Sequence, residues 1–156
     1  MRVIVTGSFD PFTLGHLEIV RQASKIYSEV YVVALINENK QYMFTMEQKK
    51  RIIELSTKDL KNVVVDVFLG MTADYMHEHK ITKIIRGYRN SNDLNYETTL
   101  ARKMTEFDEK FDTILLKSDE KYSKISSTNV RKAIVNKDDL TNYLHVDAIS
   151  YINSIF

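Results

Sequence analysis

Cysteine is absent from this chain of 156 residues, and its absence removes a whole set of chemistries. Without thiols the protein has no disulfide scaffold, no thiolate nucleophile and no cysteine-ligated zinc or iron–sulfur centre. Long apolar runs are missing as well: the longest, Val30 to Ile36, is far shorter than the ~20 residues that span a bilayer. We therefore expect no membrane segment, no signal peptide and a cytoplasmic location.

An excess of charge of either sign is also lacking. Lys and Arg total 22 against 21 Asp and Glu, which gives a formal net charge of +1. This balance predicts no general attraction to nucleic acid or to an anionic membrane, so any anion must be bound by a local site. Hydrophobic residues make up 44% and charged residues 28% of the chain, as in globular proteins, and the length suits one domain over residues 1–156.

Two kinds of apolar segment alternate along the chain: short continuous runs and segments in which apolar residues recur at helical spacing. Short runs rich in Val and Ile predict buried strands, and segments with apolar residues at helical spacing predict helices between them. The expected strands are 2–6, 30–36, 63–68, 83–85 and 113–116. The expected helices are 17–26, one that opens at a Thr45 capping box, 72–79, 94–107 and, in a C-terminal helical part of about 127–156, 127–135 and 147–155. The alternation predicts an α/β fold, a Rossmann-like doubly wound parallel five-stranded sheet with helices on both faces.

Ligands of such folds bind at the carboxyl ends of the strands, so the loops found there are the candidate functional segments. The first loop, from Thr6 to His16, lacks both the Gly-Lys-Ser/Thr of a P-loop and the Gly-x-Gly-x-x-Gly dinucleotide fingerprint. Gly15 and His16 stand where a helix is expected to begin. Free N–H groups and the helix dipole favour a phosphate there, and His16 can hydrogen-bond to it. The alternative is a solvated histidine that merely ends a turn.

The other loops at this edge carry cationic and hydroxyl side chains. The fourth strand is expected to end before Arg86-Gly87-Tyr88-Arg89, whose guanidinium groups suit phosphate oxygens. The fifth leads to three consecutive hydroxyl residues, Ser126 to Thr128, which exceed what a helix cap needs. Each feature taken alone is an ordinary surface or capping feature. Together they predict a polyphosphate site contacted by hydroxyl groups and by His16, Lys40, Arg86 and Arg89.

The order of these motifs resembles that of a known family. The segment Gly7-Ser8-Phe9-Asp10-Pro11-x-Thr13-x-Gly15-His16 is similar to the HxGH-type signature of the nucleotidylyltransferase superfamily, in its Thr-x-Gly-His form. Three later segments resemble phosphopantetheine adenylyltransferases: Arg86-Gly87-x-Arg89, Asp93-x-x-Tyr96-Glu97 and Ile125-Ser126-Ser127-Thr128. The resemblance, from residue 2 to about 135, implies transfer of AMP from ATP to 4′-phosphopantetheine without a covalent enzyme intermediate. The products would be dephospho-coenzyme A and pyrophosphate, and Mg²⁺ would be held mainly by the substrate phosphates.

The resemblance also implies roles for individual residues. His16 would stabilise the transition state, and Lys40 and Arg89 would act beside it. The expected substrate-binding residues are Ser8, Lys40, Thr72 and Arg86. The expected ATP-binding residues are Ser8, Phe9, His16, Gly87, Tyr88, Arg89, Glu97, Tyr122, Ser123, Lys124, Ile125, Ser126, Ser127 and Thr128. No protein metal ligand is expected, whereas a homohexamer and inhibition by coenzyme A are.

Departures from the family pattern leave other functions open. Ser8 stands for the usual Thr, the loop around Lys40 lacks the usual Pro and paired Lys, and Thr72 stands where leucines are common. A nicotinamide or nicotinate mononucleotide adenylyltransferase is one alternative, although Thr13 stands where that branch usually has His. A cytidylyltransferase acting on a small phosphorylated alcohol is another, and a non-catalytic nucleotide-binding module is a third.

Overall fold

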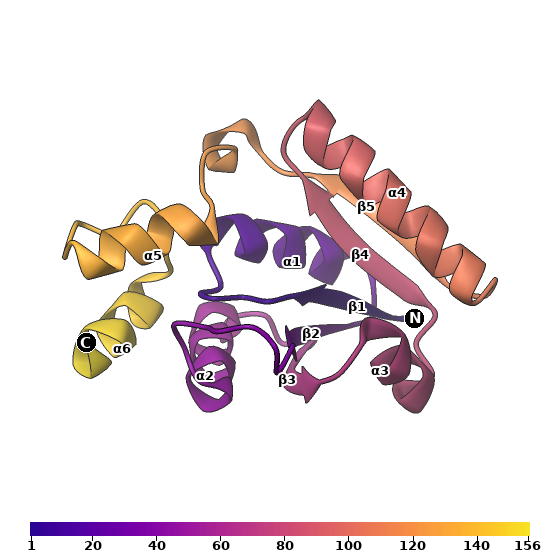
Figure 1. Ribbon diagram of the computed structural model, residues 1–156, viewed down its shortest axis with the longest axis horizontal. Helices are drawn as coiled ribbons and strands as arrows, with labels where there is room; N and C mark the ends of the chain where they lie inside the picture. Colours follow the sequence, from indigo (N-terminus) through magenta and orange to yellow (C-terminus); the bar gives the residue numbers. More distant parts are fainter.

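The computed structural model describes residues 1–156 as a five-stranded parallel sheet with helices on both faces (Figure 1). The predicted fold class is thereby confirmed. The strands are β1 (Arg2–Gly7), β2 (Glu29–Ile36), β3 (Val63–Leu69), β4 (Lys83–Tyr88) and β5 (Asp112–Lys117). The helices are α1 (Leu14–Ile26), α2 (Met46–Thr57), α3 (Thr72–His79), α4 (Ser91–Phe107), the 3₁₀ turn η1 (Glu120–Tyr122), α5 (Ser127–Val135) and α6 (Val146–Ile155). None of them combines the length and the hydropathy that crossing a membrane requires.

The strand order places the topological switch point of the sheet between β1 and β4. The order is β3-β2-β1-β4-β5, and every neighbouring pair is parallel. The chain therefore winds from β1 through β2 to β3 and then returns to the other side of β1 to form β4 and β5. The loops that leave β1 and β4 diverge at this switch point, which is where open α/β sheets bind their ligands.

Two hydrophobic clusters lie on opposite faces of the sheet. Val3 and Val5 of β1 belong to the larger cluster, together with buried residues of α1, α2, α5 and α6. Ile4, between them, belongs to the smaller cluster with Tyr75 and Met76 of α3. Successive residues of a strand point to opposite faces, so a strand covered on both faces has a continuous apolar sequence. The tail helices α5 and α6 thus pack on the same face as α1 and α2 (Figure 1).

Side-chain caps fix where the helices begin. The Thr45 hydroxyl accepts from the Gln48 N–H, and the Gln48 side chain accepts from the Thr45 N–H, so the predicted capping box of α2 is confirmed. Helices α3 and α5 begin and end at the predicted residues. For α5 the boundary signal is local, because the Ser126 cap needs only residues three positions apart, whereas α3 begins after Met71 without a side-chain cap.

The fourth strand is longer than the sequence predicts, and the prediction of a loop from Arg86 was wrong. Arg86, Gly87 and Tyr88 pair with β5 at positions 115–117. The sheet includes these residues because backbone N–H and C=O groups beside a neighbouring strand need partners. The following segment was also predicted as a loop, but α4 already begins at Ser91, after Asn90 as its N-cap. Arg86 and Gly87 are therefore held by the sheet rather than by a mobile turn.

Candidate active site

A cavity of about 410 Å³ opens at the carboxyl ends of β1 and β4. Its walls come from β1 and the loop after it, the start of α1, the end of β4, α4 and the segment that leads into α5. The predicted site residues that line it are Ser8, Phe9, His16, Arg86, Gly87, Arg89, Glu97, Tyr122, Ile125, Ser126 and Ser127. Three of the four predicted loops therefore meet at the sheet edge where they were expected.

Several predicted residues lie outside this cavity. Lys40 is exposed on the loop after β2, and it does not contribute to the cavity wall. The same holds for Tyr88, Ser123, Lys124 and Thr128, which flank lining residues. Their roles in binding stay predictions.

Thr72 lines a second cavity, of about 430 Å³, which shares Thr6 and Arg86 with the first. Lys103 brings a cationic side chain to this second cavity. The rest of its wall is mostly apolar: Leu35, Met71, Ala73, Ile84, Leu100, Ala101, Met104 and Phe107. Because Arg86 borders both cavities, a ligand with an anionic group beside Arg86 and an uncharged arm could occupy both.

Gly87 lets α1 approach β4 closely. A Cβ at this position would lie 2.7 Å from Cγ1 of Ile19 on α1, which is closer than real Cβ contacts come. A residue larger than glycine would push the helix away from the strand. The close packing brings His16, at the start of α1, to the same cavity as Arg86.

His16 is held by the N-terminal cap of its own helix. The Thr13 backbone N–H donates to Nδ1 of His16 at 3.0 Å, and the His16 N–H donates to Oγ1 of Thr13 at 3.4 Å. Since Nδ1 accepts a hydrogen bond, the neutral ring carries its proton on Nε2. Phe9 and Phe12 pack against the imidazole, with ring centroids 5.0 and 5.5 Å away. His16 thus offers an N–H donor in a fixed orientation.

The imidazole of His16 is neutral at pH 7. Burial, and then the charges of Arg86 and Arg89, lower the pKa of His16 to about 4. A cationic ring beside two guanidinium groups would be repelled, so the site favours a neutral donor over an acid.

We expect His16 to stay neutral throughout the pH range 5 to 8. In the unfolded chain this residue binds a proton near pH 6.5, whereas the folded protein binds it only near pH 4. The free energy of unfolding should therefore fall as the pH drops from 6.5 to 4, and it should fall less in His16→Gln. Imidazole nitrogen NMR measures the protonation directly. A His16 ring that titrates near pH 6.5 would contradict the assignment.

Arg86 is fixed by a buried carboxylate. Its Nε and Nη2 donate to the two oxygens of Glu97 at 2.8 and 3.0 Å, and its Nη1 donates to the Thr6 carbonyl at 3.1 Å. Glu97 is only 7% exposed. Because Nη2 carries two hydrogens, one of its N–H groups remains for an anion. In this structure Glu97 is therefore the partner of Arg86, and its contact with ATP stays a prediction.

Arg89 joins two walls of the cavity. Its Nε donates to Oδ2 of Asp93 at 2.9 Å, and its Nη1 donates to the Ile125 carbonyl at 3.0 Å. The hydrogen bond from Arg89 holds the pKa of Asp93 below its usual range. The guanidinium group is thus held by α4 and by the segment before α5, and its Nη2 is left for a ligand phosphate.

The hydroxyl groups before α5 have partners within the chain. Ser126 accepts from the Asn129 N–H as the N-cap of α5. Ser127 donates to the Pro11 carbonyl at 2.9 Å, and Thr128 accepts from Arg131 at 3.2 Å. Of the two hydroxyl groups beyond the cap, that of Ser127 therefore ties α5 to the first loop, and that of Thr128 bonds within α5. Ser126 and Ser127 line the cavity at the same time.

Fewer backbone N–H groups are free at the start of α1 than the sequence predicted. The N–H of Leu14 donates to the Tyr143 carbonyl at 2.8 Å, and that of His16 donates to Thr13. The N–H groups of Gly15 and Phe9 donate to no atom of the chain, and both residues line the cavity. These two N–H groups are among the backbone donors of the cavity that remain for an anion.

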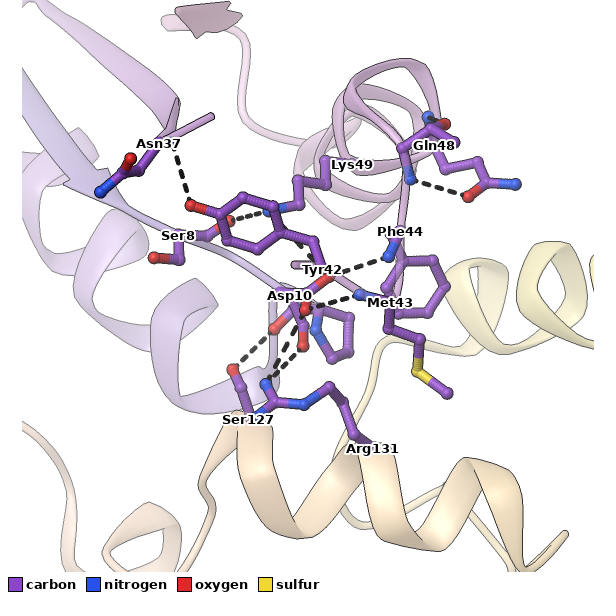
Figure 2. Close-up of polar contacts among 12 residues, drawn as sticks. Ser8, Asp10, Asn37, Tyr42, Met43, Phe44, Gln48, Lys49, Ser127 and Arg131 are labelled. Carbon is purple, nitrogen blue, oxygen red and sulfur yellow. Dashed lines mark hydrogen bonds and ion pairs between the residues drawn. The ribbon is translucent and has the colours of Figure 1, made fainter. Parts of the chain in front are cut away.

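Sequence reasoning missed two buried charged side chains behind Ser8, those of Asp10 and Lys49, with the partly exposed Arg131 of α5 beside them (Figure 2). Lys49 has no exposed surface, and burial lowers its pKa to about 8, although the charge of Asp10 acts to raise it. A signal for it does exist. Lys49 stands three and four positions before Ile52 and Ile53, which places it on the buried side of α2.

No group of three or more His, Asp or Glu side chains stands in position to hold a metal ion. The carboxylates that line the first cavity belong to Asp93 and Glu97, and each is paired with an arginine. The residues of this chain therefore do not form a ligand set for a divalent cation.

Several known proteins are similar to this chain. Residues 4–133 match the family model described as Cytidylyltransferase-like. A phosphopantetheine adenylyltransferase of Clostridium novyi (strain NT) is 38% identical over 136 residues, which cover 86% of this chain and 84% of that protein. The phosphopantetheine adenylyltransferase of Bdellovibrio bacteriovorus is 38% identical over 133 residues, covering 85% and 83% of the two chains, respectively. That of Shouchella clausii is 34% identical over 140 residues, covering 90% and 88%.

A solved structure supports the fold alone. A crystal structure assigned to a nicotinate-nucleotide adenylyltransferase from Vibrio parahaemolyticus superposes with a TM-score of 0.69 and covers 97% of each chain. Its sequence identity to this chain is 18%. At that identity the likeness carries no information about the acceptor.

Proposed function

Because this chain belongs to the phosphopantetheine adenylyltransferase family of cytidylyltransferase-like proteins, we propose that it transfers the adenylyl group of ATP to 4′-phosphopantetheine. An acceptor phosphate oxygen forms a bond to the α-phosphorus, the bond to the β-phosphate oxygen breaks, and pyrophosphate leaves. The observation that carries the proposal is the cavity between β1 and β4, where neutral His16 meets Arg86 and Arg89.

The residues of the cavity supply position and charge rather than a nucleophile. Transfer of this kind needs the acceptor in line with the leaving group and donors for the charge on the phosphoryl oxygens. His16 provides a neutral Nε2–H, and the two arginines each have an Nη2 donor left for phosphate. These groups are held by their own partners before a substrate arrives, so little reorganisation is needed at the moment of reaction.

The second cavity supports 4′-phosphopantetheine as the acceptor. This acceptor combines an anionic phosphate with a long uncharged arm, and Arg86 stands between the phosphate cavity and the mostly apolar one. Thr72 and Met71 both line the apolar cavity, so a threonine at position 72 still leaves an apolar wall for the arm. A mononucleotide acceptor would place a second charged and ribose-bearing group there instead.

Mg²⁺ is proposed as an ion carried by the phosphates of ATP. Magnesium usually keeps several waters and binds substrate phosphates rather than a cage of protein ligands. The absence of a ligand set among the side chains fits that mode, and no step of the transfer is assigned to the ion.

The proposed setting is a cytoplasmic homohexamer that coenzyme A inhibits, as the family resemblance implies. Coenzyme A shares the pantetheine arm and the nucleotide of the reaction product, so the same two cavities could bind it. The exposed apolar side chains of Met71 and Phe107, which line the second cavity, offer surface that association could bury.

Pyrophosphate release with Mg²⁺ should occur with ATP and 4′-phosphopantetheine, and not with other pairs of substrates. The measurement crosses ATP and CTP against 4′-phosphopantetheine, nicotinamide mononucleotide and glycerol 3-phosphate. Turnover with nicotinamide mononucleotide would reassign the acceptor, and turnover with CTP would reassign the nucleotide. Silence in every combination would favour a nucleotide-binding module without turnover.

A further inference from the structure

The ammonium group of Lys49 lies directly behind the loop that follows β1 (Figure 2). Nζ donates to the Ser8 carbonyl at 2.8 Å, lies 3.5 Å from the ring centroid of Tyr42 and is 4.0 Å from Oδ1 of Asp10. Burying a charge costs desolvation free energy, and an apolar side chain of similar length would avoid that cost. The amine therefore does something that packing alone does not require.

The contact with Lys49 fixes the peptide between Ser8 and Phe9. In a trans peptide the C=O and the N–H point in opposite directions, so a Ser8 carbonyl turned towards α2 turns the Phe9 N–H away from α2. Phe9 has a φ of 47°, in the left-handed region that a bulky side chain rarely adopts. The local backbone would not choose this arrangement alone, so an outside contact has to maintain it.

The Phe9 N–H is an unused donor in a buried residue. Phe9 is 4% exposed, its N–H donates to no atom of the chain, and the residue lines the first cavity. Buried backbone N–H groups are almost always paired, so one left free at the wall of a cavity points to a ligand that accepts its hydrogen bond. A phosphate oxygen is the acceptor that the arginines of the cavity also suit.

The same ammonium group also holds the loop after β2. Its charge lies over the face of the Tyr42 ring, and the Tyr42 hydroxyl accepts from the Asn37 N–H at 3.0 Å. The Asp10 carboxylate accepts from the backbone N–H groups of residues 43 and 44 at 2.9 and 3.0 Å. Arg131 of α5 donates to the Asp10 carbonyl at 2.9 Å. The two loops and α5 are thus joined around one buried charge (Figure 2).

We propose that Lys49 is a positioning residue that, by holding the Ser8 carbonyl, presents the Phe9 N–H as a donor to a phosphate of the nucleotide. Lys49 does not touch the ligand, since its side chain is fully buried beneath the loop. The inference rests on the proposed function only in that the cavity binds a polyphosphate. The Phe9 N–H would add a backbone donor to the cationic side chains of the cavity. This role would also explain why a charged residue stands on the buried side of α2.

The test is the affinity for inorganic pyrophosphate and for α,β-methylene ATP, measured by calorimetry without turnover. Lys49→Met keeps the apolar stem and removes the donor, and it should weaken both affinities roughly ten- to hundredfold, as expected for a lost hydrogen bond to a charged group. Lys49→Arg should restore most of the affinity because it keeps a donor for the carbonyl. Lys50→Met, on the exposed side of the same helix, is the matched control and should bind as wild type does.

The Phe9 amide itself provides a second readout by NMR. In the wild-type protein pyrophosphate should shift the Phe9 amide proton downfield, and in Lys49→Met this shift should be lost while the Gly15 amide still responds. If pyrophosphate leaves the chemical shift of the Phe9 amide proton unchanged in the wild-type protein, the proposal is overturned, even if Lys49→Met fails to fold. Wild-type affinity in a folded Lys49→Met would overturn it as well. Normal pyrophosphate binding without any turnover would count against the proposed reaction alone.

Discussion

Replacing His16 with alanine should lower kcat for adenylyl transfer by roughly two to three orders of magnitude while ATP affinity changes only a few-fold. Negative charge on the α-phosphoryl oxygens is redistributed in the transition state, and a donor fixed in advance stabilises that state more than the bound substrate. The Thr13 N–H holds the imidazole by Nδ1 at 3.0 Å, and a pKa of about 4 keeps the ring neutral, so Nε2–H is the donor.

Steady-state kinetics and a separate measurement of ATP binding distinguish this role from simple binding. The expected pattern is a large loss of kcat with a nearly unchanged dissociation constant for ATP. His77→Ala, which removes an exposed histidine of α3, is the matched control and should leave both quantities unchanged. An intact kcat with ATP affinity reduced as much as kcat/KM would show that His16 only binds the nucleotide.

The fold could be predicted because its signals are local. A strand covered on both faces must be apolar throughout, and a surface helix must repeat its apolar residues every three or four positions. The bounds of α3 and α5 follow from such patterns. The end of β4 does not follow from a local pattern, since Arg86 and Gly87 enter the sheet only because β5 runs beside them. Pairing with a distant strand leaves no trace in the composition of either segment.

The location of the candidate site in the fold could be predicted from the sequence, but the hydrogen bonds among its residues could not. The chain topology brings His16, Arg86 and Arg89 to one edge, and any parallel sheet of this order would do the same. Which partner each group chooses depends on contacts across the chain. Lys49 reaches a carbonyl 41 positions away, and a lone lysine in a sequence is ordinarily expected at the surface. The spacing of Lys49 before Ile52 and Ile53 indicates that it is buried, but the partners of its ammonium group follow only from the three-dimensional structure.

Replacing Arg86 with alanine should raise the KM for 4′-phosphopantetheine by roughly a hundredfold at saturating ATP, with a smaller change in kcat. Arg86 borders both cavities, and the free N–H of its Nη2 is placed for the acceptor phosphate. Titrating the acceptor against the variant measures the effect. The same change removes the partner of buried Glu97, and leaving one member of a buried ion pair alone costs about 3–5 kcal/mol of stability.

The two consequences can be separated by a second substitution at Glu97. In Arg86→Ala/Glu97→Gln no unpaired charge is left at position 97, so the midpoint of thermal unfolding should recover towards wild type. The acceptor KM should stay high, because the donors to the phosphate are still missing. Arg86→Lys should have an acceptor KM between that of the wild type and that of Arg86→Ala. The lysine keeps the charge but loses the planar pair of donors that engages both Glu97 oxygens. An acceptor KM restored by the Glu97 substitution would mean that Arg86 serves to neutralise Glu97 and does not hold the acceptor itself.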